Sequence, residues 1–184
     1  NYNDGFDTDT GFSGSSGLRG GRGKASDVEA NDFAGSARIQ YTGFKGMRFG
    51  FSSFVGKTAQ GDSRVSGGLV ALLEADAKFH FEGIELEGLV AVVFNSDAGE
   101  MTTAQRTDGN IDATDVIGER MFGYMIEAGY HVFHHIWEDA PVDLVAFVRF
   151  EQFDTHHAVP TGFTKNTAFD RQTITMGLSF YPMD

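Results

Sequence analysis

Seven stretches of this chain alternate apolar and polar residues with a period of two, and this alternation strongly limits the fold. In residues 33–42, Ile39 and Tyr41 fall on one parity while Arg38 and Gln40 fall on the other. Successive side chains of a β-strand point to opposite faces, so each stretch has one apolar and one polar face. The pattern predicts an all-β chain of antiparallel strands.

The connections between these stretches alternate between short and long. Residues 43–46 and 82–83 are tight turns, whereas residues 96–119 and 154–170 are long polar segments without periodicity. Transmembrane β-barrels combine tight periplasmic turns with long extracellular loops, and their tilted strands need roughly 9–11 residues. We therefore predict an antiparallel transmembrane β-barrel. Its strands are expected at residues 33–42, 47–57, 68–81, 84–95, 120–133, 142–153 and 171–181.

The polar face of these predicted strands carries many charged side chains of both signs, which a soluble sandwich does not normally show. In a membrane barrel the polar face meets the water of the lumen and the apolar face meets lipid. The predicted pore-lining residues are Arg38, Arg48, Glu74, Asp76, Lys78, Glu85, Glu87, Glu127, Arg149, Glu151 and Arg171.

The composition excludes several other classes of function. The 184 residues contain no cysteine, which removes disulfides, thiol catalysis and thiolate metal sites. A formal net charge of −12 argues against nucleic acid as a partner, because phosphate neutralisation needs a basic surface. The sequence offers no serine, histidine and acid placed for a hydrolase. We expect neither enzymatic activity nor a cofactor.

Residues 1–32 are expected to form an extracellular loop of a single β-barrel domain, with the strands in residues 33–181. Within this loop Arg19, Arg22 and Lys24 form the densest basic cluster of the chain. The cluster lacks the spacing and the strand-to-helix context of a phosphate loop. It is a candidate constriction loop that folds into the pore, with a merely exposed loop as the alternative.

The histidines do not predict a metal site. His131, His134 and His135 lie beside a predicted short turn, whereas His156 and His157 lie in a predicted long loop. These two groups belong to opposite ends of the predicted strands, so they cannot share one ion.

The number of predicted strands suggests that the barrel is larger than this chain. Bacterial single-chain barrels have even numbers of strands, and an open sheet would leave unpaired edges in lipid. Seven predicted strands is an odd number, and Pro182 ends the last one at an expected turn. We expect an internal part of a larger barrel, with an eighth strand hidden in residues 1–32 as the alternative.

Several segments, taken in order, resemble a known family. They read QYTG at 40–43, GMRFG at 46–50, GYHV at 129–132, FVRFEQFD at 147–154 and GLSFYP at 177–182. This order resembles the phosphate-selective porin O/P family of Gram-negative outer membranes. The resemblance implies a barrel of about 16 to 18 strands, usually a homotrimer, that lies in the cell outer membrane among lipid and lipopolysaccharide. It also implies passive ion transport, with small solutes, including anions, as the candidate cargo.

Two other classes of function stay open. In a soluble or surface β-sandwich binding module, the apolar faces would form the core. A non-conducting barrel could instead anchor a surface assembly through its acidic loops. Detergent dependence separates the sandwich from both kinds of barrel.

Overall fold

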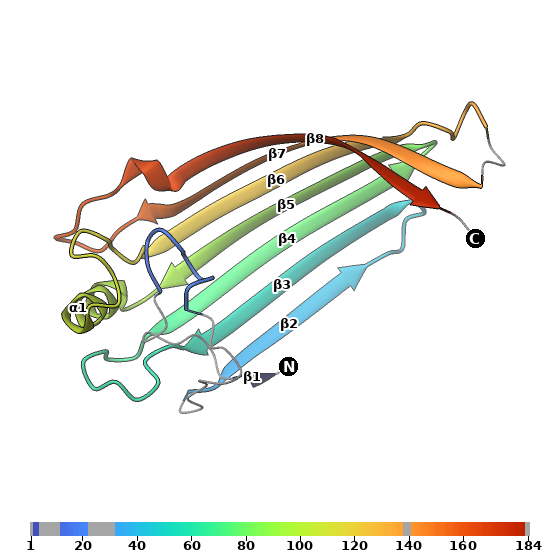
Figure 1. Ribbon diagram of the computed structural model, residues 1–184. Helices are drawn as coiled ribbons and strands as arrows, with labels where there is room; N and C mark the ends of the chain where they lie inside the picture. The colour runs from blue at the N-terminus through green and yellow to red at the C-terminus, as the bar shows by residue number, and fades with distance from the viewer. Residues whose placement is uncertain (1, 4–11, 22–31, 138–140, 183–184) are drawn as a thin grey trace.

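The protein folds into one curved antiparallel sheet with a helix and loops gathered at one end (Figure 1). The computed structural model describes residues 2–3, 12–21, 32–137 and 141–182. Each strand pairs with its neighbours in the sequence, and β8 pairs only with β7 among these residues, so the sheet is open. The strands are β1 (Tyr2–Asn3), β2 (Ala34–Tyr41), β3 (Met47–Lys57), β4 (Leu69–Phe81), β5 (Ile84–Asn95), β6 (Arg120–His131), β7 (Val142–Ala158) and β8 (Asp170–Pro182).

The predicted all-β, antiparallel architecture is confirmed, and the seven long strands β2 to β8 are the seven predicted ones. The largest error in the bounds is at β7, which continues to Ala158 instead of ending at residue 153. A register shift between Arg120 and Phe122 of β6 accompanies this extension. Such a bulge interrupts the period-two pattern, so the sequence of residues 154–158 does not alternate.

The helix α1 (Ala98–Asp108) lies in a segment that the sequence predicts to be a loop. Apart from Met101, its buried face consists of small or polar residues, including Thr102 and Gln105, so the sequence shows no apolar helical stripe. Thr102 is buried because its hydroxyl donates to the Ala98 carbonyl and accepts from the Ile117 amide. Within the described ranges, no helix is long and apolar enough to cross a membrane.

Three loop segments join α1 to form what we call the cap: residues 12–21, 58–68 and 109–119. The hydrophobic core of the protein lies between the cap and the end of the sheet, where Phe12, Met101 and Ile117 are fully buried. Val93 and Met121, which face each other across β5 and β6, contribute the strand side of this core. Both residues share a face with the charged side chains of their strands. The cap therefore covers the polar face at this end of the sheet.

Truncating Met101 to alanine should loosen the cap and leave the strands paired. Loss of a fully buried methionine costs about 2–5 kcal/mol, and Met101 lies in the core between the cap and the end of the sheet. We expect trypsin to cleave the Met101→Ala variant after Arg106 faster than the wild type. The exposed Thr107→Ala substitution on the same helix is the control, and equal cleavage rates in the two variants would contradict this packing.

Candidate functional site

The convex face of the sheet is apolar along all seven long strands. Residues that pair directly across strands share a face, and one such row joins Ile39, Phe51, Ala75, Val90 and Tyr124. The large apolar side chains of this face are exposed on every strand: Ile39 73%, Phe51 50%, Leu73 37%, Val90 42%, Ile126 58%, Val148 45% and Met176 75%. A contiguous apolar surface of this kind marks contact with a membrane or with another protein.

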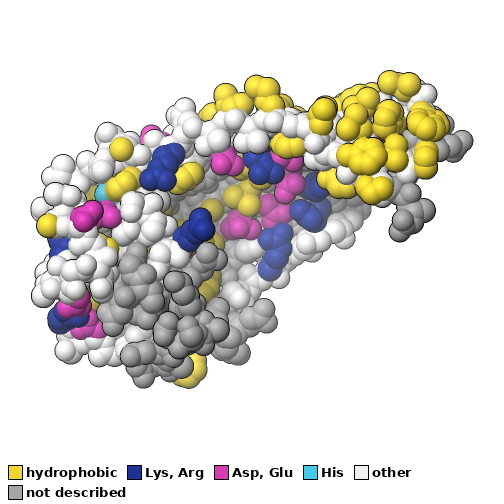
Figure 2. Space-filling view, viewed as in Figure 1, with side chains coloured by type: hydrophobic (Ala, Val, Ile, Leu, Met, Phe, Trp, Pro, Cys, Tyr) yellow, Lys and Arg dark blue, Asp and Glu magenta, His cyan; other side chains and the backbone are white. Residues whose placement is uncertain are grey.

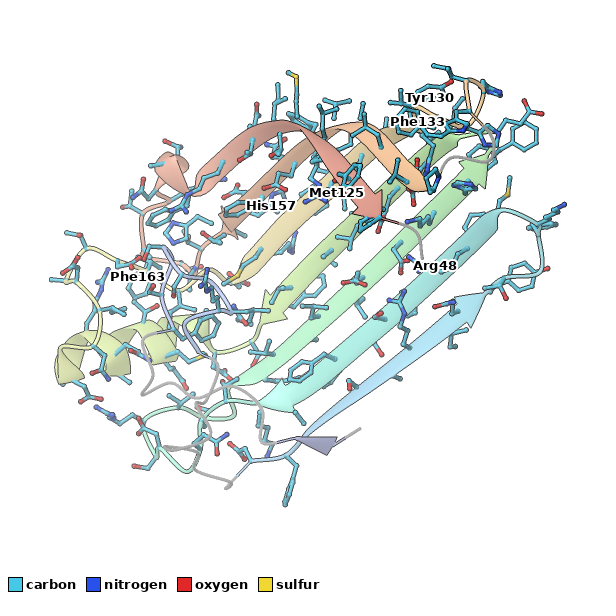
Figure 3. All side chains as sticks on the ribbon, turned by 45° about the vertical axis from the view of Figure 1, so that its right-hand side comes forward. Arg48, Met125, Tyr130, Phe133, His157 and Phe163 are labelled. Atoms are coloured by element: carbon cyan, nitrogen blue, oxygen red, sulfur yellow. The ribbon has the colours of Figure 1, made fainter. Side chains whose placement is uncertain are left out.

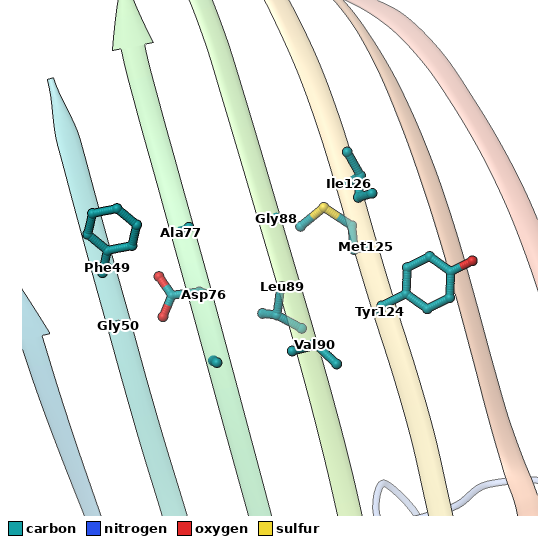
Figure 4. A pocket seen from close by; sticks show the side chains of 11 residues that line it. Phe49, Gly50, Asp76, Ala77, Gly88, Leu89, Val90, Tyr124, Met125 and Ile126 are labelled. Carbon is teal, nitrogen blue, oxygen red and sulfur yellow. The ribbon is translucent and has the colours of Figure 1, made fainter.

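A shallow groove of about 500 Å³ crosses the convex face. Figure 4 shows Phe49 and Ile126 on either side of Ala77 and Gly88, and the methyl group of Ala77 and the missing side chain of Gly88 leave this space. Asp76, which also borders the groove, directs its carboxylate to Arg38 on the other face of the sheet. The groove can accept an apolar chain, but it has no converging polar groups to orient a specific ligand.

The concave face carries the charged residues, and Figure 2 shows acidic and basic side chains gathered along the hollow. Strand register places all the predicted pore-lining residues on this one face. Of the candidate constriction loop, Arg19 is exposed within the cap, whereas Arg22 and Lys24 lie outside the described residues. That the face lines a pore stays a prediction.

One row of charges crosses five strands at the same level. Arg48 and Lys78 face each other on β3 and β4, and Glu87 and Glu127 face each other on β5 and β6, followed by Arg149 on β7. Like charges directly opposite each other destabilise a sheet, so each needs a partner of opposite sign. The ion pairs are Arg48–Asp76 at 3.6 Å, Lys78–Glu87 at 3.9 Å and Arg149–Glu127 at 2.7 Å, together with Lys78–Glu85.

The ion pairs also include a residue of β2, whereas none within the described residues includes a residue of β8. Arg38 reaches across β3 to Asp76 at 2.6 Å and to Glu74 at 3.2 Å. Among the predicted pore-lining residues, only Arg171 and Glu151 lack an ion pair within the described part of the chain. The Arg171 guanidinium lies over the Phe153 ring, 5.7 Å from its centroid, in a cation–π contact. Because most of these charges remain partly exposed to water, their pairing contributes little stability.

Polar contacts hold the cap against the end of β7. The His156 ring lies 2.6 Å from the Val116 carbonyl oxygen, and the Thr155 hydroxyl donates to the Gly14 carbonyl at 2.5 Å. Position 14 must be glycine, because a β-carbon there would collide with the His156 ring and the Val116 carbonyl. Residues 12–21 therefore pack closely against β7 and the loop before β6.

The histidines are grouped in a way that the sequence does not reveal. His131, on β6, lies near His80 and Glu85, at the end of the sheet opposite the cap. The labelled Tyr130 and Phe133 mark this end in Figure 3, whereas His157 and Phe163 lie toward the cap. The available signal was the two-residue turn 82–83, which pairs His80 directly with Glu85.

Comparison with known proteins adds one distant relative. No family model matches this chain. Over 173 residues, 93% of the chain, it is 24% identical to an uncharacterized protein of Aquifex aeolicus (strain VF5). The chain spans 39% of the length of that protein. The similarity therefore extends over most of the sheet and the cap, but it assigns no activity to them.

The pKa values of two cap carboxyls should depend on Arg64. This guanidinium hydrogen-bonds Asp62 and Asp108 and holds the pKa of both below the ordinary value of 3.8. Lowered carboxyl pKa values stabilise the fold above the ordinary pKa, and this stabilisation disappears as the pH falls through the lowered values. NMR titration of the carboxyl carbons should show both midpoints rising in Arg64→Gln. The exposed Arg19→Gln is the control, and unchanged midpoints in Arg64→Gln would refute the bridge.

Proposed function

We propose that this chain forms part of the wall of a transmembrane β-barrel, with its convex face toward lipid and its concave face toward water. The observation that supports this proposal is the contrast between the faces: exposed large apolar side chains on one and charged ones on the other. Among the described residues, β8 has no partner on its outer edge, and a barrel in lipid needs one there, because backbone groups in lipid require hydrogen-bond partners. Further strands, which close the barrel, would satisfy them.

The function that follows is that of an outer-membrane porin of a Gram-negative bacterium, a passive channel for small solutes. The sequence resemblance to the phosphate-selective porin O/P family supports this proposal, as do the short turns at one end of the sheet and the cap at the other. The partners we propose are the lipid bilayer, lipopolysaccharide and two further copies in a homotrimer. We assign no catalytic residues to this channel.

Selection in this channel depends on the electrostatic field across the lumen. Arg48 and Lys78 form a positive region next to the negative region of Glu87 and Glu127. Rings of charged side chains set the ion selectivity of such pores. This field acts on hydrated solutes as they pass and orients them. The cap narrows the path, because it occupies the concave face at one end.

A soluble β-sandwich is less well supported. It needs a second sheet to cover the convex face, and the described residues form one sheet only. Large apolar side chains such as Met176 and Leu178 would otherwise stay in water, where they are 75% and 70% exposed.

Arginine substitutions on the two faces test which face meets lipid. Val148→Arg or Leu86→Arg on the convex face should reduce barrel stability by roughly 2–4 kcal/mol near the bilayer midplane, because the guanidinium loses its hydration. Thr175→Arg and Gln40→Arg are the matched controls on the concave face, and they should assemble normally. Heat-modifiable gel mobility reports assembly. Equal assembly of all four variants would refute the barrel proposal.

Planar-bilayer recordings test conduction separately from assembly. Across a salt gradient, Arg149→Gln should shift the reversal potential toward cation selectivity, and Glu127→Gln should shift it toward anion selectivity, because each removes one lumen charge. Asp112→Asn, an exposed residue of the cap, is the control. A barrel that assembles but does not conduct would refute the porin and favour the non-conducting anchor.

A further inference from the structure

Three potential metal ligands meet on the concave face at the end opposite the cap. They are His80 of β4, Glu85 of β5 and His131 of β6, and their ligand atoms all lie within 4.8 Å of one another. Register fixes this meeting, since His80 pairs directly with Glu85 and the His131 amide donates to the Gly83 carbonyl at 2.8 Å. The three side chains thus come from adjacent strands, held together by the turn at residues 82–83.

Asp143 determines how the His131 ring presents itself to the other two residues. Its carboxylate lies 2.5 Å from His131 Nδ1, so Nδ1 carries the proton and Nε2 presents a lone pair when the ring is neutral. Nε2 is buried and has no hydrogen-bond partner. It lies 3.5 Å from Glu85 Oε2: a protonated ring pairs with this carboxylate, whereas in the neutral ring a lone pair faces the carboxylate oxygen and a cation between them removes the repulsion.

The surrounding groups complete the ligand arrangement. Lys78 pairs with Glu85 Oε1, which leaves Oε2 as the free oxygen on the His131 side. A histidine ligand whose second nitrogen is held by a carboxylate, and a ligating carboxylate that is itself hydrogen-bonded, are typical outer-shell features of metal sites. Three carboxylates, those of Glu85, Glu87 and Asp143, lie near the site, and Lys78 and Arg48 are cations on the same face beside them.

We infer that His80, Glu85 and His131 bind a divalent first-row transition-metal ion, with Asp143 as a positioning residue. Two imidazoles and one carboxylate are a ligand set that zinc and its neighbours accept, with a fourth position open to water. Bonds of about 2.0–2.1 Å place tetrahedral ligand atoms about 3.3 Å apart. The three ligand atoms lie within 4.8 Å of one another, so binding requires the exposed His80 ring to turn toward the other two ligands. This inference does not depend on whether the barrel conducts.

The test is zinc binding to the purified protein in detergent, measured by isothermal titration calorimetry, with Co²⁺ absorption spectra as a second readout of the ligand geometry. We expect His80→Ala or His131→Ala to weaken binding at this site by at least about 100-fold, and Asp143→Asn by about 10- to 100-fold. The double variant His134→Ala/His135→Ala is the control, because these exposed rings lie in the adjacent turn and pack on each other. It should bind zinc as the wild type does.

Three results would overturn the inference. They are no zinc binding by the wild type at micromolar concentration, unchanged binding in His80→Ala, and loss of binding in the control variant alone. His80→Ala decides the question if His131→Ala fails to fold, because the His80 side chain is exposed and supports no core contact. Heat-modifiable gel mobility shows separately that each variant assembles.

Discussion

Everything in this structure depends on the register of one antiparallel hydrogen-bonded ladder. Across the seven long strands, residues of the concave face pair with residues of the concave face on the next strand. Examples are Arg38 opposite Ser52 and Arg149 opposite Thr175. A slip of one residue in any pairing would exchange the two faces of that strand. It would place charges such as Glu127 among the apolar side chains of the convex face. The separation of the faces is thus a property of the backbone pairing, which the side-chain pattern specifies.

The environment of the protein contributes directly to its stability. The fully buried hydrophobic residues lie mostly under the cap, whereas large apolar side chains such as Phe51 and Ile126 remain exposed. Apolar burial is the dominant favourable term in folding, and large apolar side chains of all seven long strands lie on the uncovered face. The charged face adds little, because its ion pairs stay partly exposed to water. Whatever covers the convex face therefore supplies much of the driving force for the fold.

The strands could be predicted from the sequence because one face of the sheet is apolar and the other is charged, and this difference produces the period-two pattern. The predicted bounds at 47–57 and 84–95 agree with β3 and β5. The cap could not be predicted in this way, because α1 packs through Thr102 and Gln105, and its contacts with Phe12 and Val65 join distant segments. The cluster of His80, Glu85 and His131 also depends on which strands are neighbours, so the sequence does not predict it in full. The turn at 82–83 does pair His80 with Glu85.

The two ends of the sheet differ greatly in the bulk of what connects the strands. At one end the connection between β4 and β5 is minimal, with Glu82 and Gly83 in left-handed backbone conformations, and β2 joins β3 through residues 42–46. At the other end the cap contains a helix, buried polar groups and the Arg64 bridge between Asp62 and Asp108. Moving such a polar, folded mass through hydrocarbon is costly. In the barrel that we propose, the tight turns face the periplasm and the cap faces the exterior, so the bilayer has to be crossed by the cap segments and not by the tight turns.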